Sequence, residues 1–131
     1  MSKKKVTKRI MVPRTRNAET LTESQYFSKI RSALRSCFRY WKPMKIALEN
    51  SSRKSQSLNK KLKKEYQCAH CKDWFSRDNV EIDHIIPAGS LKSFDDIAPF
   101  IIRLTSEKIS DYQILCKTDH KIKTYAEKTT R

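Results

Sequence analysis

The chain has 131 residues, and its 29 Lys and Arg against 14 Asp and Glu give a formal net charge of +15. This charge density costs self-repulsion unless the usual partner is a polyanion, so a nucleic acid is the leading expected partner and an anionic membrane surface the second. The longest apolar run, residues 97–102, is too short for a membrane span or a secretory signal, which excludes an integral membrane protein and predicts a soluble, intracellular one.

The length fits one compact domain with an additional arm or helix. One glycine and four prolines leave few residues suited to tight turns, so substantial helix is expected. In an intracellular protein the four cysteines are expected to be metal ligands or free thiols rather than disulfides. The sequence leaves open whether the protein is a monomer or a dimer.

Residues 1–16 are strongly basic, with seven Lys or Arg and no acidic residue. A segment of this composition cannot bury itself, so we expect a disordered arm. The arm either lies along the phosphates of a nucleic acid or serves only as a solubilising tail, and the sequence favours neither.

Residues 20–64 are expected to form a helical region. Thr20 and Glu23 have the spacing of a capping box, and apolar residues then recur every three or four positions as far as Trp41, which predicts an amphipathic helix. Its apolar stripe is expected to pack in the core and to bury the thiol of Cys37. A row of cations on another side of the helix is either a phosphate contact or a solvated face. The row consists of Arg31, Arg35, Arg39 and Lys42, and the three arginines are the expected DNA contacts among them.

Further helices are expected on both sides of the centre of the chain. Pro43 is expected to end the first helix and to begin a second one in its first turn. Leu58, Leu62 and Tyr66 then recur with a spacing of four among lysines, which predicts a basic helix. Residues 93–105 are expected to form a short capped helix, and residues 111–128 a strand, a tight turn and a closing helix.

Two short segments rich in aromatic and β-branched residues, Trp74–Phe75 and Val80–Ile82, predict a β-hairpin. The second segment runs into Asp83 and His84. Asp83 offers a hard oxygen ligand and His84 a group that exchanges protons near neutral pH, a combination typical of a catalytic site. The alternative is a structural histidine near a strand end whose hydrogen bonds are satisfied within the fold. Successive strand side chains point to opposite faces, so the strand must twist, bulge or end here, and Pro87 indicates that it ends.

Three motifs then occur in order along the chain. They are Cys68-x2-Cys71, Asp83-His84-Ile85-Ile86-Pro87 and Leu115-Cys116-x2-Asp119-His120-x2-Lys123-Thr124. This set resembles the HNH endonucleases, and especially small bacteriophage HNH proteins with a zinc knuckle. The resemblance implies an α+β fold whose ββα-metal core, residues 65–128, clamps a divalent cation against a scissile phosphate with a hairpin and a helix.

The resemblance also implies roles for the central residues. Asp83 and His120 hold the catalytic Mg²⁺ or Mn²⁺, and His84 is the general base that activates water. Phosphodiester hydrolysis requires such a base and a cation at the developing charge. Asp111 stands where the family usually has Asn and is included among the catalytic residues, but a carboxylate only accepts hydrogen bonds. It therefore binds metal, braces the loop or fills neither role.

The structural zinc knuckle of the family usually has four cysteines, and here the fourth position is an aspartate. The implied ligands are Cys68, Cys71, Cys116 and Asp119. Three thiolates and a carboxylate can bind Zn²⁺, while His70 or Cys37 in place of the carboxylate, or no zinc at all, are alternatives. DNA contacts are expected from the arginine row and from Lys121 and Lys123.

The expected function is a divalent-metal-dependent DNA endonuclease that leaves 5′-phosphate and 3′-hydroxyl ends, acting in the host cytoplasm if it is phage-encoded. One alternative is a non-catalytic zinc-knuckle protein that binds nucleic acid, but a structural knuckle requires neither Asp83 nor His84. Another is a basic structural protein, which leaves the cysteine and histidine spacing unexplained. Nothing in the sequence indicates the target, the number of strands cut or the biological role.

Overall fold

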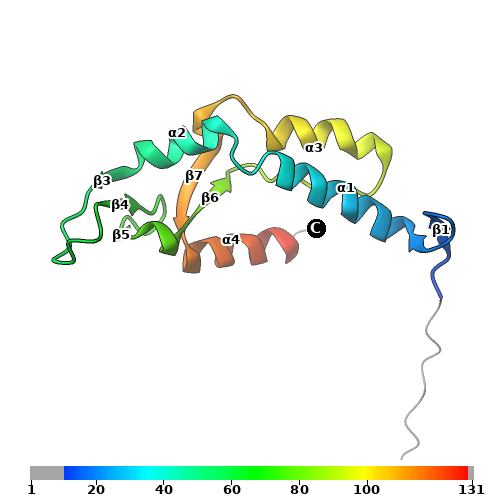
Figure 1. The fold of residues 1–131 in the computed structure, drawn as a ribbon, viewed down its shortest axis with the longest axis horizontal. Coiled ribbons are helices and arrows are strands. Elements are labelled where there is room, and N and C mark those ends of the chain that lie inside the picture. The colour runs from blue at the N-terminus through cyan, green and yellow to red at the C-terminus, as the bar shows by residue number, and fades with distance from the viewer. Residues whose placement is uncertain (1–10, 130–131) are drawn as a thin grey trace, which may run out of the picture.

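The computed structural model describes residues 11–129, which form helices and three small antiparallel sheets (Figure 1). The helices are α1 (Glu23–Cys37), α2 (Lys42–Asn50), α3 (Ile97–Leu104) and α4 (Lys117–Thr129). The strands are β1 (Arg14–Arg16), β2 (Leu21–Thr22), β3 (Ser52–Lys54), β4 (Lys64–Gln67), β5 (Trp74–Phe75), β6 (Val80–His84) and β7 (Tyr112–Cys116). This mixture is compatible with the expected α+β class, and none of the described helices has the length and apolarity needed to span a bilayer.

The central element is the antiparallel pair of β6 and β7, in which Val80 lies opposite Cys116 and His84 opposite Tyr112. The predicted hairpin between Trp74–Phe75 and the following strand is wrong, because β5 pairs with β4 instead. β5 is only two residues long and so offers β6 few pairing positions. β7 instead pairs with all five residues of β6. The connection between β6 and β7 is long and contains α3.

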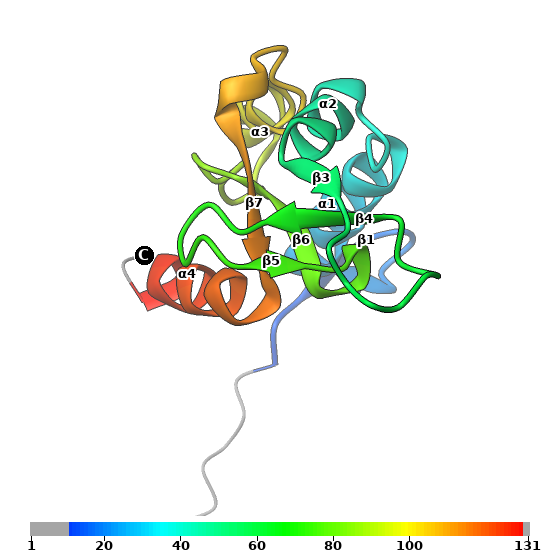
Figure 2. The same cartoon turned by 90° about the vertical axis from the view of Figure 1, so that its left-hand side faces the viewer.

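The β6–β7 pair is covered on both faces. Leu48 of α2 packs with Val80 and Ile114 on one face, and α4 packs on the other. In both views α2 lies above β6 and beside the upper part of β7, and α4 lies below the two strands (Figure 1 and Figure 2). Because side chains alternate along a strand, each face presents every second residue of β6 to a different helix.

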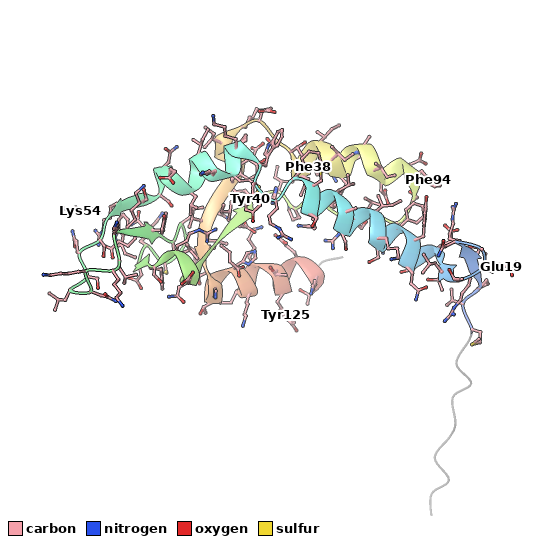
Figure 3. All side chains as sticks on the ribbon, in the orientation of Figure 1. Glu19, Phe38, Tyr40, Lys54, Phe94 and Tyr125 are labelled. Carbon is pink, nitrogen blue, oxygen red and sulfur yellow. The ribbon has the colours of Figure 1, made fainter. Side chains whose placement is uncertain are left out.

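The largest core cluster joins α1 to α3. Phe27 of α1 packs with Phe100 and Leu104 of α3, and Phe94 lies beside the N-terminal half of α1 with its ring centroid 5.0 Å from that of Phe27 (Figure 3). The apolar stripe of α1 is therefore core, as predicted. Cys37 is exposed, contrary to expectation, because it is the last residue of the helix and its neighbours on the stripe provide the packing.

The start of α1 differs from the prediction in its cap. Thr22 is the N-cap, and Gln25 completes the capping box, so the assignment of Thr20 and Glu23 to these roles is wrong. Glu23 instead binds Arg16 of β1, with Nε and Oε1 2.6 Å apart. Residues 14–16, expected to belong to the disordered arm, therefore form a strand held to α1, while residues 1–10 of that arm lie outside the described residues.

The predicted basic helix through Leu58, Leu62 and Tyr66 is wrong. β3 and β4 form a hairpin there, with Leu58 fully exposed in the loop and Tyr66 buried in β4; Lys54 lies at the end of the molecule opposite to β1 (Figure 3). Side-chain oxygens in the loop each accept a hydrogen bond from the backbone N–H two residues on, which competes with helix formation. They belong to Ser55, Ser57 and Asn59.

Candidate functional site

A pocket of about 550 Å³ lies at the end of β6. Asp83 and His84 line it from β6, His120 from α4, and Arg31 and Arg35 from α1. Figure 1 shows α1 and α4 on either side of this strand end. The volume is within the range of about 300–1,000 Å³ that is usual for ligand sites. The structure therefore brings the three predicted central residues together with two of the three predicted arginines.

Asp83 and His84 reach the same pocket although they are consecutive. Asp83 points to the face covered by α4, where it contacts His120, and His84 points to the other face, where it contacts Tyr112 and Leu104. β6 ends at His84, so both faces open at that point. The prediction that the strand ends here is confirmed.

The imidazole of His84 is fixed by two contacts. Its Nε2 lies 3.1 Å from the carbonyl oxygen of Leu104, and its ring packs edge-on against Tyr112 with centroids 5.1 Å apart. A carbonyl oxygen only accepts, so Nε2 carries the proton of the neutral ring and Nδ1 keeps the lone pair. His84 is therefore arranged to accept a proton at Nδ1.

The carboxylate of Asp83 is buried and has three neighbours. Its Oδ2 accepts hydrogen bonds from Gln113 (2.9 Å) and from the ammonium of Lys123 (3.0 Å), and its Oδ1 lies 3.5 Å from Nε2 of His120. Burial acts to lower the pKa of Lys123, but Glu127 and Asp83 outweigh it and raise this pKa. These contacts give the oxygens of the buried Asp83 side chain hydrogen-bonding and ionic partners in place of water.

Lys123, which was expected to contact DNA, has its ammonium engaged within the protein. Its ammonium binds the carboxylates of Asp83 and Glu127 and the backbone oxygen of His84, and only 24% of its side chain is exposed. Lys121, the other predicted contact on α4, is exposed. Arg39 is exposed outside the pocket, 3.5 Å from the hydroxyl of Ser36. The predicted cation row is therefore divided between the pocket and the outer surface.

His120 is oriented by a residue that the sequence did not assign to the site. Glu81 of β6 binds Nδ1 of His120, which leaves Nε2 directed toward Asp83. Histidines that ligate metals usually donate their other ring N–H to a carboxylate in this way. Glu81 precedes Asp83 by two residues and so shares its strand face, which is the signal that was available in the sequence.

Asp111 does not line the pocket. Its carboxylate accepts a hydrogen bond from the hydroxyl of Ser106, and its backbone oxygen accepts one from the N–H of Ile85 at 2.9 Å. These contacts tie the segment that enters β7 to the residue that follows His84. Of the three roles left open for Asp111, the arrangement favours bracing of the loop.

A second cluster of potential ligands lies between the end of β4, the end of β7 and the first turn of α4. Its ligand atoms all lie within 4.8 Å of one another and can hold a metal ion. They belong to Cys68, Cys71, Cys116 and Asp119. Neither of the alternatives, His70 or Cys37, belongs to this cluster in the described part of the chain. A tetrahedral zinc with Zn–S bonds of about 2.3 Å needs ligands about 3.8 Å apart, so the cluster fits after a small contraction.

Backbone hydrogen bonds shape the turn that carries the first two cysteines. The N–H of Lys72 donates to the carbonyl of Cys68 at 3.1 Å, and Lys72 has a left-handed φ of 66°. The carboxylate of Asp119 lies 3.2 Å from the sulfur atoms of Cys68 and Cys116. Hydrogen bonds from these two thiols lower the pKa of Asp119. The fourth group is therefore an ionised oxygen ligand held against two buried sulfur atoms.

Comparison with known protein families, with curated proteins and with solved structures found no match.

Proposed function

We propose that the chain is a divalent-metal-dependent DNA endonuclease in which β6, β7 and α4 form a ββα-metal core of the HNH type. The observation that carries this proposal is the convergence of Asp83, His84 and His120 on one pocket, from the strand end and the helix that face each other there. A net charge of +15 supports a nucleic acid as the substrate.

Each residue has a definite task in this hydrolysis. His84 takes a proton from water at Nδ1 while the water oxygen bonds to phosphorus, and the P–O3′ bond breaks with its electron pair on O3′, which takes up a proton. Asp83 and His120 would hold the cation, and waters and substrate phosphates would supply its remaining ligands, as is usual for Mg²⁺. A bound cation would supply charge stabilisation at the phosphoryl oxygens.

We also propose that the cysteine cluster holds a structural Zn²⁺. Thiolate ligands in a tetrahedral arrangement favour zinc over Mg²⁺ and Ca²⁺, which prefer oxygen ligands. The cluster joins β4, β7 and α4, so a metal there would fix the helix that carries His120 against the strand pair.

The proposed function is tested by incubating purified protein with supercoiled plasmid in Mg²⁺ or Mn²⁺. We expect relaxed and linear DNA to accumulate, and we expect EDTA to stop the reaction and excess Mg²⁺ to restart it. The His84→Ala variant, purified identically, controls for contaminating nucleases. Tight plasmid binding without cleavage in either cation would instead support the non-catalytic nucleic-acid binder.

Glu81→Gln is expected to weaken the catalytic metal site without removing a ligand. The amide is a weaker acceptor for Nδ1–H of His120, and loss of such outer partners typically costs about 10–100-fold in metal affinity. The Mg²⁺ concentration at half-maximal cleavage should rise by that factor, while the rate at saturating Mg²⁺ changes little. Glu49→Gln, which loses only a surface ion pair with Lys64, is the matched control. An unchanged Mg²⁺ requirement in Glu81→Gln would contradict the positioning role.

A further inference from the structure

Two arginines of α1 enter the pocket from outside the β6–β7–α4 unit. Arg31 and Arg35 are one helical turn apart, and their guanidinium carbons lie 5.9 and 5.6 Å from the ring centroid of Phe100. Phe100 is fully buried in the core between α1 and α3. The shared ring therefore holds both guanidinium groups on the side of α1 that lines the pocket.

Within residues 11–129, the positive charge of Arg31 and Arg35 has no carboxylate partner among the ion pairs. None of the ion pairs found among the described residues involves Arg31 or Arg35, and the acidic groups of the pocket are bound to Lys123 and His120. Arg35 remains exposed, but partial desolvation, and then the charge of Arg31, lower its pKa. Like charges one helical turn apart destabilise a helix by a few tenths of a kcal/mol, so an anion between them relieves an existing repulsion.

We propose that Arg31 and Arg35 form a clamp for a phosphate of the DNA strand that is cut, so that α1 completes the active site. This rests on the proposed function and names the group bound beside Asp83, His84 and His120. Guanidinium groups bind phosphate through paired N–H donors, which an ammonium cannot reproduce. The clamp is distinct from a general surface contact because both groups line the pocket, whereas Arg39 of the same row does not.

The first measurement is the kinetics of plasmid cleavage by Arg35→Lys, Arg35→Gln and Arg31→Lys. Loss of one positioned donor to a developing oxyanion costs roughly 10²–10³-fold in kcat, so we expect losses of that size for Arg35→Gln and smaller ones for the lysine variants. Lys29→Ala, which removes an exposed cation of α1 outside the pocket, is the matched control and should cleave at the wild-type rate.

The second measurement does not depend on cleavage. Inorganic phosphate is titrated into ¹⁵N-labelled full-length protein, and the Nε–Hε resonances of Arg31 and Arg35 should shift together while that of Arg39 stays in place. If phosphate moves these resonances but the wild type cuts no DNA, the two arginines form a phosphate site, while the proposed function and the role of that site in cleavage both fail. If the wild type cuts but Arg35→Gln behaves like Lys29→Ala, or phosphate moves neither resonance, the clamp is refuted.

Discussion

Replacing His84 by Ala is expected to lower the rate of DNA cleavage by roughly 10²–10⁴-fold, the usual contribution of a positioned general base. The Nε2–H of His84 is committed to the carbonyl oxygen of Leu104, so only Nδ1 is left to take a proton from water. Removing the ring leaves Asp83 and His120 in place. The variant should therefore bind DNA and divalent cation as the wild type does.

Asp83→Ala and His120→Ala are expected to fail differently from His84→Ala. Each removes one of the two groups that would hold the cation, so cleavage should be partly restored by raising Mg²⁺ or Mn²⁺. The assay is nicking rate against metal concentration for each variant. His70→Ala, which removes an exposed histidine outside this pocket, is the control for the loss of an imidazole.

The opposite pattern would overturn these assignments. Rescue of His84→Ala by excess cation would make His84 a ligand rather than a base. A wild-type rate in His120→Ala would remove the paired ligand from the mechanism. Loss of DNA binding in His84→Ala, measured by gel shift in EDTA, would indicate a folding defect, because the contacts of His84 with Leu104 and Tyr112 also pack the end of β6.

The residues of the candidate sites could be predicted from the sequence because they occur in short motifs, and the spacing within each motif lets the side chains meet at one point. Two intervening residues allow Cys68 and Cys71 to face one point from a tight turn. The combination of an acid and a histidine in an otherwise apolar strand marked Asp83 and His84, since such a pair is unusual in a buried strand. The structure brings both sets together.

Long-range strand pairing was not accessible in the same way. The segment Val80–Ile82 has a nearer candidate partner in Trp74–Phe75, but it pairs with β7 across the whole segment that contains α3. A local sequence pattern indicates that a segment is a strand. Which strand it pairs with depends on the surface that the pair buries, here against α2 and α4. The strand spacing already places Glu81 on the face of Asp83. Its contact with His120, and the contact of Lys123 with Asp83, depend on where α4 packs and became visible only in three dimensions.

If the cysteine cluster holds zinc as proposed, removing that zinc is expected to destabilise the unit formed by β4, β7 and α4. Cys68 and Cys116 are buried and form a small core cluster with Leu115, against which the half-buried Phe75 packs. Structural zinc contributes roughly 10–16 kcal/mol of apparent binding free energy in zinc-finger peptides, comparable with the total stability of about 5–15 kcal/mol of an ordinary domain. We therefore expect one zinc per chain by elemental analysis.

The effect of substituting a cysteine should depend on whether that cysteine is a ligand of the proposed zinc. Cys68→Ser is expected to lose zinc and to cost more than about 4 kcal/mol, which corresponds to a fall in melting temperature on the order of 10 °C or more. Cys37→Ser is the matched control, since this cysteine is exposed and lies outside the cluster, and it should change neither zinc content nor stability. A reduced, well-folded and zinc-free wild type would refute the structural role of the cluster.

The aspartate ligand offers a sharper test than the loss of a thiolate. Asp119→Cys restores four sulfur ligands at a position whose carboxylate already lies 3.2 Å from the sulfur atoms of Cys68 and Cys116. It should keep one zinc per chain and release it to a chelator more slowly than the wild type, because thiolates are the softer ligands. Asp119→Ala should release it faster. Equal release rates in the three proteins would exclude Asp119 from the ligand set while leaving the three cysteines in it, and His70→Ala would then be the next variant to measure.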